Sequence, residues 1–221
     1  MTEKPTPQAV DAFLDSTVIG DDPDLAAALK ASNAAGLPQI AVSWQQGKFL
    51  FLLAGAIQAR RVLEIGTLGG FSTIWLARGV GPHGQVLTLE YEPNHADVAR
   101  ANLQRAGVAD RVQVVVGAAL ETLPTIKGDP FDLVFIDADK EHYVEYLQFA
   151  VKLARPGAVI VVDNVIREGA ILSPESDDAK VAATRETLQV MGQHAQLDTA
   201  VIQTVGAKHW DGFAIALVKD L

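Results

Sequence analysis

The chain has 221 residues, of which 49% are hydrophobic and 20% are charged, and its formal net charge at pH 7 is −9. This length suits one domain with a sizeable core, and the composition excludes an intrinsically disordered chain. The absence of cysteine excludes disulfides, thiolate metal sites and a cysteine nucleophile, and the acidic balance disfavours a general affinity for nucleic acid or anionic membranes.

The N-terminal stretch MTEKPTPQAV lacks a basic segment followed by an apolar core, and no apolar run reaches the roughly 18 residues that a membrane span needs. We therefore expect a cytoplasmic protein without a membrane partner. We expect a single domain over residues 1–221, with an N-terminal helical cap over 1–60 and an α/β core over 61–221.

Two helices are predicted ahead of the first strand. The pair Asp22-Pro23 is typical of a cap followed by proline at the first helical position, and Gly36 is placed to end that helix. The stretch Ser43–Gln46 matches a capping box, in which both end side chains bond to the backbone, before the apolar run Phe49–Ile57.

From residue 61 onward, apolar strands alternate with helices. The predicted strands are Val62–Ile65, Val86–Leu89, Val112–Val116, Leu133–Ile136 and Ala158–Val162. The predicted helices between them are Gly70–Arg78, Pro93–Ala106, Ala118–Leu123 and Lys140–Ala154. Strands that are apolar on both faces and separated by helices indicate a doubly wound parallel sheet.

The C-terminal part is predicted to finish this sheet with a hairpin. A polar loop, Arg167–Asp177, precedes a helix near Asp178–Gly192. Two strands, Ala200–Gln203 and Phe213–Val218, are joined by the turn Val205–Gly212, and so short a connection favours antiparallel pairing. The fold class is therefore α/β, with a Rossmann-like sheet of seven strands, mostly parallel, and a reversed C-terminal strand.

The loop after the first strand has glycines that would let a ligand approach the backbone. Its spacing, Gly66-x-x-Gly69-Gly70, differs from the G-x-G-x-x-G of dinucleotide-binding proteins. Glu90 follows the second strand, where an acid can accept both hydrogen bonds of a ribose diol. We favour a nucleoside ligand over the alternative, in which the glycines only permit close packing of strand and helix.

Polar side chains also follow the fourth and fifth strands. Asp137, Asp163 and Asn164 should lie on adjacent strand ends, and their oxygen donors suit Mg²⁺, Mn²⁺ or Ca²⁺. The alternative, that Asp163 and Asn164 only begin a turn, is equally compatible with these residues. Lys140 is a candidate general base, although it could also be a solvated helix lysine, and Asp139 is predicted to be the N-cap of the next helix.

Four stretches together resemble the cation-dependent O-methyltransferase family, which includes the catechol and caffeoyl-CoA O-methyltransferases and belongs to the class I methyltransferases. The similarity runs in collinear order from about Ser32 to the C-terminus. The four stretches are VLEIGTLGGFS (Val62–Ser72), FIDADKEHY (Phe135–Tyr143), VVDNV (Val161–Val165) and KHWDGFAIALV (Lys208–Val218).

The resemblance implies a bound S-adenosylmethionine and a divalent cation, normally Mg²⁺. It places the methyl donor against Val42, Glu64, Gly66, Thr67, Ser72, Glu90, Ala118, Asp137 and Asp139. It implies that Asp137, Asp163 and Asn164 are the metal ligands and that Lys140, with Asp137 and Asn164, carries out catalysis. The implied reaction methylates one hydroxyl of a vicinal diphenol such as caffeate.

Three other functions stay open at this point. Some bacterial relatives are thought to methylate a hydroxylated tRNA base, but the acidic net charge disfavours nucleic acid. A nicotinamide-dependent oxidoreductase could use the same sheet, although its glycine spacing would differ. A catalytically silent binding protein is the third alternative. We also expect a homodimer, in which the N-terminal helices contribute to the interface or to a lid.

Overall fold

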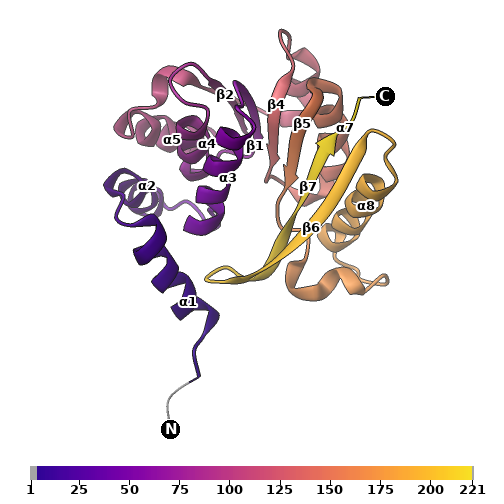
Figure 1. Ribbon diagram of the computed structural model, residues 1–221, viewed down its shortest axis with the longest axis horizontal. Helices are drawn as coiled ribbons and strands as arrows, with labels where there is room; N and C mark the ends of the chain where they lie inside the picture. The colour runs from indigo at the N-terminus through magenta and orange to yellow at the C-terminus, as the bar shows by residue number, and fades with distance from the viewer. Residues whose placement is uncertain (1–3, 221) are drawn as a thin grey trace.

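A seven-stranded sheet runs through the centre of the molecule, with helices on both of its faces (Figure 1). In this computed structural model, which describes residues 4–220, the strand order is β3-β2-β1-β4-β5-β7-β6. The strands are β1 (Arg61–Ile65), β2 (Gln85–Glu90), β3 (Val112–Val116), β4 (Phe131–Ile136), β5 (Ala154–Val162), β6 (Leu197–Gly206) and β7 (His209–Val218). Strands β1 to β5 are parallel, and β7 is antiparallel to β5 and β6. The predicted fold class is confirmed.

The predicted helix starts in the N-terminal region are also present. The α-helices are α1 (Pro7–Leu14), α2 (Pro23–Ala34), α3 (Trp44–Ala56), α4 (Phe71–Gly79), α5 (Pro93–Arg105), α6 (Ala119–Thr122), α7 (Tyr143–Leu153) and α8 (Ala179–Gln193). Asp22 caps α2 by accepting from Leu25 N at 3.1 Å, and Ser43 caps α3 by accepting from Gln46 N at 3.2 Å. Across residues 4–220, no helix has both the length and the apolar character of a membrane span.

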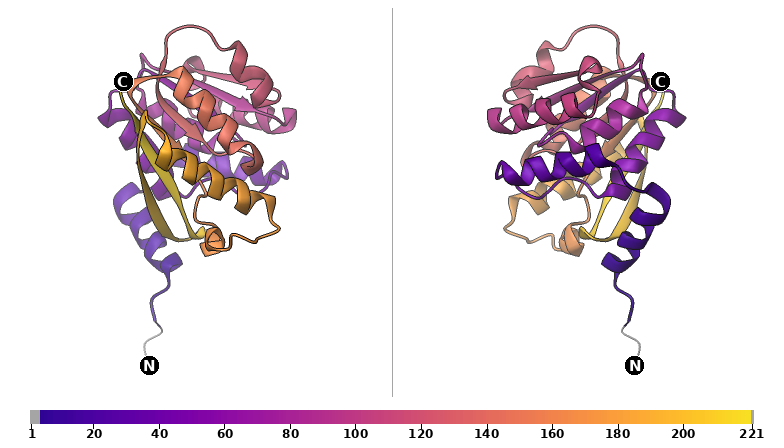
Figure 2. Two further views of the ribbon diagram at one scale, coloured as in Figure 1. Left: turned by 90° about the vertical axis from the view of Figure 1, so that its right-hand side faces the viewer. Right: turned by 90° about the vertical axis from the view of Figure 1, so that its left-hand side faces the viewer.

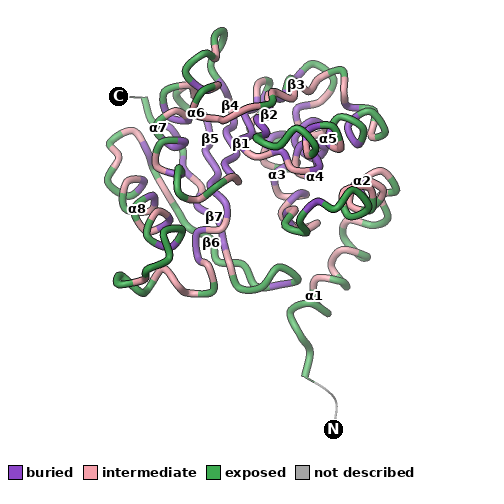
Figure 3. Tube along the Cα trace, turned by 180° about the vertical axis from the view of Figure 1, so that it is seen from behind, coloured by how far each residue is buried: buried purple, intermediate pink, exposed green. Residues whose placement is uncertain are grey.

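The two faces of the sheet are covered by different helices, as the opposite views of Figure 2 show. Helices α2 to α5 pack on the face that contains Val62 and Phe135, and α7 and α8 pack on the face that contains Leu63 and Ile136. The central strands are buried along their length (Figure 3) because alternate side chains enter the two cores. This covering explains why β1 and β4 are apolar on both faces.

Helix α1 was not predicted, and none of its residues is buried. Thr6 caps it by accepting from Ala9 N at 3.2 Å, and Pro7 stands in its first turn. The helix lies against the tip of the β6–β7 hairpin, where Asp11 accepts a hydrogen bond from Ala207 N at 2.7 Å. Its large apolar side chains, Val10 and Phe13, are therefore exposed.

The β6–β7 hairpin is longer than the sequence predicted. Ladder pairing continues to Gly206 and His209, so the turn consists of Ala207 and Lys208, and the predicted turn Val205–Gly212 is wrong. Val205 pairs with Trp210, a β-branched and aromatic cross-strand pair of the kind that stabilises antiparallel strands beyond the sheet. The hairpin tip thereby reaches the N-terminal helices.

Candidate active site

The carboxyl ends of β1, β4 and β5 meet at the point where the strand order reverses, which is where open parallel sheets bind ligands. Asp137 N donates to Ile65 O at 2.9 Å, and Asp163 N donates to Ile136 O at 2.9 Å. These bonds continue the parallel ladder by one residue beyond each strand. The sheet therefore brings together the two acids that the sequence placed on adjacent strand ends.

The glycine loop between β1 and α4 lies directly against the end of β4. Gly66 has a φ of 99°, and a Cβ at this position would overlap the carbonyl oxygen of Asp137. Gly70 is left-handed, with a φ of 81°, at the N-cap of α4. Glycine is needed at both positions, because the backbone is left-handed and, at Gly66, has no room for a side chain.

Glu64 lies beneath this loop and is completely buried. Its carboxyl accepts from Ser72 Oγ at 2.6 Å, from Thr73 Oγ1 at 2.5 Å and from Thr88 Oγ1 at 2.6 Å. Burial raises the pKa of Glu64 to about 7, although the three hydroxyl groups work in the opposite direction. Glu64 thus holds α4 and β2 around the loop, and it engages the hydroxyl of Ser72, a predicted cofactor contact.

Glu90 joins the same loop to the end of β2. Its Oε2 accepts from Thr67 N at 3.1 Å and from Leu68 N at 2.7 Å. Its Oε1 accepts from Glu92 N at 3.0 Å and lies 3.2 Å from His95 Nδ1. A carboxylate offers about four lone-pair sites, so a ribose diol at Glu90 would share or replace these contacts.

Lys140 lies beside Asp137, as the sequence predicted for a base near the metal ligands. Its Nζ is 3.0 Å from Asp137 Oδ1 and donates to Tyr143 Oη at 2.6 Å. The buried Tyr143 donates in turn to the backbone oxygen of Asp163 at 3.1 Å. Tyr143, which was not predicted as a site residue, therefore ties the lysine to both strand ends. No pattern in the sequence separates it from an ordinary core tyrosine.

Asp163 and Asn164 end β5 in a constrained conformation. Burial and the charge of Asp137 both raise the pKa of Asp163, and Gln46, Lys140 and the Asn164 amide work against them. Asn164 has a φ of 56°, an uncommon value for a residue other than glycine that is often found at functional sites. Asp163 is therefore a buried acid whose ionised form is disfavoured by burial and by the neighbouring charge of Asp137.

Gln46 is a second residue that the sequence did not assign to the site. In the predicted capping box, the side chain of Gln46 would bond to the backbone N–H of Ser43. Only the other bond of the motif forms, in which the hydroxyl of Ser43 accepts from Gln46 N. The buried Nε2 of Gln46 has no well-formed hydrogen bond within residues 4–220, yet it is near enough to Asp163 to lower the pKa of that carboxyl. The role predicted for Gln46 is therefore wrong.

Asp139 occupies the predicted N-cap position but does not cap the helix with its side chain. The segment begins as a 3₁₀ turn over Lys140–His142, and Asp139 instead accepts from Tyr146 Oη at 2.6 Å and pairs with His142. Partial burial works against ionisation, but these two contacts lower the pKa of Asp139 below its usual value. The capping prediction is wrong because the carboxyl of Asp139 bonds to His142 and Tyr146, one and two turns further along the chain, and to no backbone N–H of the helix.

The other predicted cofactor contacts border the same edge. Val42 is buried just before the start of α3, and Ala118 is the N-cap residue of α6, two residues after the end of β3. Thr67 lies in the glycine loop, where its hydroxyl is 2.6 Å from that of Thr88. No contact in the protein tests whether these residues touch a ligand, so their role stays a prediction.

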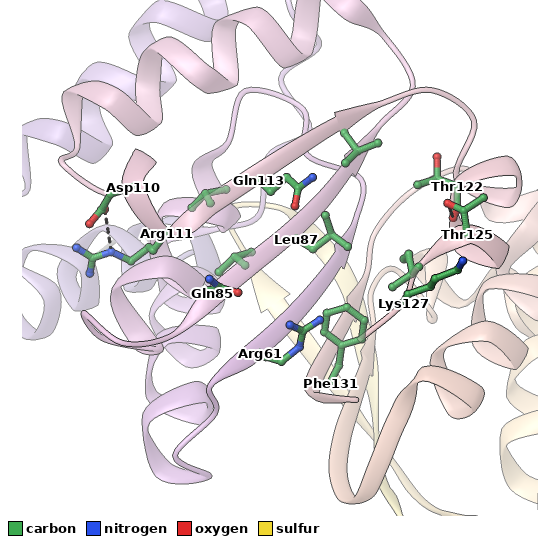
Figure 4. Close-up of a pocket in the computed structure, with 14 residues that line it drawn as sticks. Arg61, Gln85, Leu87, Asp110, Arg111, Gln113, Thr122, Thr125, Lys127 and Phe131 are labelled. Carbon is green, nitrogen blue, oxygen red and sulfur yellow. Dashed lines mark hydrogen bonds and ion pairs between the residues drawn. The ribbon is translucent and has the colours of Figure 1, made fainter. Parts of the chain in front are cut away.

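A separate groove of about 480 Å³ lies at the opposite ends of the strands (Figure 4). The starts of β1 to β4 line it, and the guanidinium of Arg61 lies 5.1 Å from the ring centroid of Phe131 there. None of the predicted site residues lines this groove. The predicted site residues therefore lie apart from this groove.

The donor set at that edge fits a hard divalent cation. Asp137 and Asp163 are neighbouring carboxylates, and Asn164 follows Asp163 in the chain; carboxylate and amide oxygens of this kind suit Mg²⁺. Among residues 4–220, no three side chains of His, Cys, Asp or Glu are grouped to hold a metal, so no third side chain of these types joins Asp137 and Asp163.

The strand order, the glycine loop at the switch point and the acid–lysine cluster together define a class I methyltransferase fold. A protein-family model described as "O-methyltransferase" matches residues 16–217. The chain belongs to the O-methyltransferase family.

Individual relatives are similar to the chain over nearly all of its length. A catechol O-methyltransferase of Mycobacterium tuberculosis is 74% identical, and the alignment covers 99% of both chains. The O-methyltransferase of Bacillus cereus, solved in complex with SAH, is 46% identical with a TM-score of 0.95, covering 96% of this chain and 98% of that one. TomG of Streptomyces achromogenes, solved in complex with SAM, is 45% identical with a TM-score of 0.95 and full coverage of both chains. The resemblance predicted from the four motifs is confirmed.

Proposed function

We propose that the protein transfers the methyl group of S-adenosylmethionine to one hydroxyl of a catechol-type small molecule, with Mg²⁺ held by Asp137, Asp163 and Asn164. The observation that carries this proposal is the contact of Lys140 Nζ with Asp137 Oδ1, at 3.0 Å, beside the glycine loop. The similar proteins that are named catechol O-methyltransferase or were solved with SAM support the acceptor class and the methyl donor.

The methyl donor would lie along the glycine loop. Gly66 and Thr67 would border its methionine portion, which Glu64 supports from beneath, while Ser72 would bind the carboxylate and Glu90 the ribose. Val42, Ala118 and Asp139 would complete this cofactor set. Since Ser72 Oγ donates to Glu64 at 2.6 Å, we expect its hydroxyl to turn toward the carboxylate when the donor binds.

Lys140 would act as the general base in its neutral amine form. Its two N–H groups would bond to Asp137 and Tyr143, and its free lone pair would accept the proton of a substrate hydroxyl beside Asp137. When bound, Mg²⁺ would hold the vicinal hydroxyls and lower their pKa. The deprotonated oxygen then forms a bond to the methyl carbon as the carbon–sulfur bond breaks, and the electron pair of that bond stays on sulfur in the released S-adenosylhomocysteine.

The test is methylation of caffeate by the purified protein with S-adenosylmethionine, followed by chromatography of the products. We expect a monomethyl ether with Mg²⁺, none after EDTA treatment, and recovery when Mg²⁺ is restored. Undiminished turnover after metal removal would refute the metal site. If the protein methylates no diphenol but does methylate hydroxylated tRNA, its acceptor is a tRNA base and not a catechol.

We also propose that the protein is a homodimer in which the exposed face of the first helical segment is covered. Phe13 is 64% exposed, and Val10 and Val18 are exposed beside it on α1 and the π-helical turn Asp15–Ile19. Apolar side chains gathered on one exposed segment are typical of an interaction surface. Light scattering should give the dimer mass for the wild type and a lower mass for Phe13→Ser.

A further inference from the structure

The groove at the amino ends of β1 to β4 is lined by both apolar and polar side chains (Figure 4). Its volume of about 480 Å³ falls in the range of roughly 300–1,000 Å³ that is typical of small-molecule sites. Helix α6, whose Thr122 lines the groove, has only four residues, and Leu87, Val115 and Ile126 are left partly buried at the edge of the core. The groove therefore offers a ligand an apolar surface that the protein does not fully cover.

Arg61 brings a cation without an acidic partner to this groove. Its guanidinium lies 5.1 Å from the ring centroid of Phe131, and a Cβ added at Gly128 would be 3.7 Å from its Nη2. The side chain takes part in none of the ion pairs formed by residues 4–220, and its buried Nε has no hydrogen-bond partner among them. Asp132 accepts from the backbone amide of Arg61, but its carboxyl is paired with the side chain of Arg155. The guanidinium thus keeps N–H donors for a ligand.

The charges of the lining favour an anion. The lining contains three cations, Arg61, Arg111 and Lys127, and one acid, Asp110. Asp110 lies 3.2 Å from Arg111 Nε, so its charge is already compensated there. Lys127 is exposed and belongs to no ion pair in the described part of the chain. The groove is therefore locally positive, although the chain as a whole has a net charge of −9.

The arrangement of these groups suits a carboxylate better than a phosphate. A guanidinium can donate two parallel hydrogen bonds to one carboxylate, and that of Arg61 is partly buried against Phe131. The other partly buried cation, Arg111, is already paired, and Lys127 is solvated. A phosphate dianion would need a second partly buried cation to offset the cost of its desolvation. One charge beside an apolar surface matches a ligand that carries a single carboxylate on an apolar body.

We propose that this groove is a second ligand site, which binds a small organic acid with its carboxylate on Arg61 and its apolar body against Leu87 and Val115. The site lies apart from the carboxyl edge of the sheet, so the inference does not depend on the proposed function. A suitable probe is 3-phenylpropionate, which has a carboxylate and an apolar ring. It has no hydroxyl group and is therefore no methyl acceptor of the proposed kind.

The test compares 3-phenylpropionate with 3-phenylpropanamide, which has nearly the same shape but no charge, by calorimetry. We expect Arg61→Met to bind the acid about tenfold more weakly than the wild type, with less than about a twofold change for the amide. Methionine keeps an unbranched apolar side chain beside Phe131, and thermal unfolding checks that the variant is folded. Arg60→Met removes a neighbouring exposed arginine that does not line the groove, so this matched control should bind the acid as the wild type does.

A second variant decides the inference if Arg61→Met does not fold. Lys127 is exposed, so Lys127→Glu should leave the fold intact while it reverses one charge of the lining. We expect this variant to bind the acid about threefold more weakly, with no change for the amide. Equal binding of the acid by Lys127→Glu and the wild type would contradict the local positive charge as the cause.

Three results would overturn the inference. The first is no binding of 3-phenylpropionate by the wild type at millimolar concentration, and the second is an equal loss for acid and amide in Arg61→Met. The third is loss of binding in Asp137→Asn, which would place the ligand in the candidate active site instead. Tighter binding of phenyl phosphate, with the same dependence on Arg61, would replace carboxylates by phosphate esters as the ligand class.

Discussion

Replacing Glu64 by glutamine tests the electrostatic cost of the carboxyl group buried beneath the glycine loop. Burial raises the pKa of Glu64 from 4.5 to about 7. At about 1.4 kcal/mol for each pKa unit, the ionised carboxylate destabilises the folded state by about 3 kcal/mol at alkaline pH. Glutamine keeps the shape of the side chain, and the hydroxyls of Ser72, Thr73 and Thr88 can rotate to suit its amide.

The direction of the pH dependence follows from which state binds the proton more tightly. Folded Glu64 holds its proton to a higher pH than unfolded Glu64, so its contribution to stability is lost as the pH rises from the unfolded pKa of 4.5 through the folded pKa of about 7. About 2 kcal/mol of this loss should fall between about pH 5.5 and about pH 8.5, a range above the pI near 4.9.

Urea unfolding followed by circular dichroism, without ligands, measures the free energy of unfolding of both proteins across this pH range. We expect the wild type to lose about 2 kcal/mol more than Glu64→Gln as the pH rises. Asp163 also has a raised pKa, but it is present in both proteins and cancels from the difference. Parallel pH curves for the two proteins would refute the reasoning, because they would mean that Glu64 ionises as easily in the folded as in the unfolded state.

Three further predictions concern the site and its support. Lys140→Met should lower kcat by about 100-fold or more, as expected when a general base is lost, while calorimetry should find S-adenosylhomocysteine affinity unchanged; normal turnover would remove Lys140 as the base. Gly66→Ala should abolish measurable S-adenosylhomocysteine binding, because the added Cβ overlaps the carbonyl oxygen of Asp137; wild-type affinity in calorimetry would contradict this. Asp132→Ala should destabilise the protein by about 1–3 kcal/mol in urea unfolding, since the carboxyl accepts from the backbone amides of Arg60 and Arg61. The hydrogen bonds that the Asp132 carboxyl accepts lower its pKa, although burial opposes them. The loss of stability in Asp132→Ala should therefore shrink as the pH falls below the ordinary pKa range of aspartate. A loss that stays constant with pH would contradict this explanation.

Local sequence patterns predicted the architecture because they reflect burial directly. The buried runs of β1 and β4 are apolar on both faces, and such strands are stable only in a sheet covered on both sides. Once the strands are parallel, their carboxyl ends lie at one edge, so Asp137 and Asp163 could be placed together without coordinates. The helix caps of Asp22 and Ser43 were predictable for the same reason, since each bond spans only three residues.

The predictions that were wrong concern side chains with more than one available partner. Asp139 bonds to Tyr146 and His142 rather than capping the helix, and Gln46 lies near Asp163 rather than bonding to Ser43. In each case the side chain has a competing partner that the short sequence motif does not contain. The motif shows only the backbone group beside it, so it predicts the wrong contact. The length of the β6–β7 hairpin was missed in the same way, because α1 supports its tip from nearly 200 residues away in the chain.

The α/β fold, the edge of the sheet proposed for the site and the acids and lysine that lie there follow from local sequence patterns, because alternating burial and parallel topology leave few other arrangements. The groups that surround these acids and this lysine, in contrast, depend on how distant segments pack together. The tertiary structure placed Tyr143 between Lys140 and Asp163 and brought Gln46 near Asp163. These arrangements join distant segments and depend on the direction of single side chains, which the packing of the whole core sets.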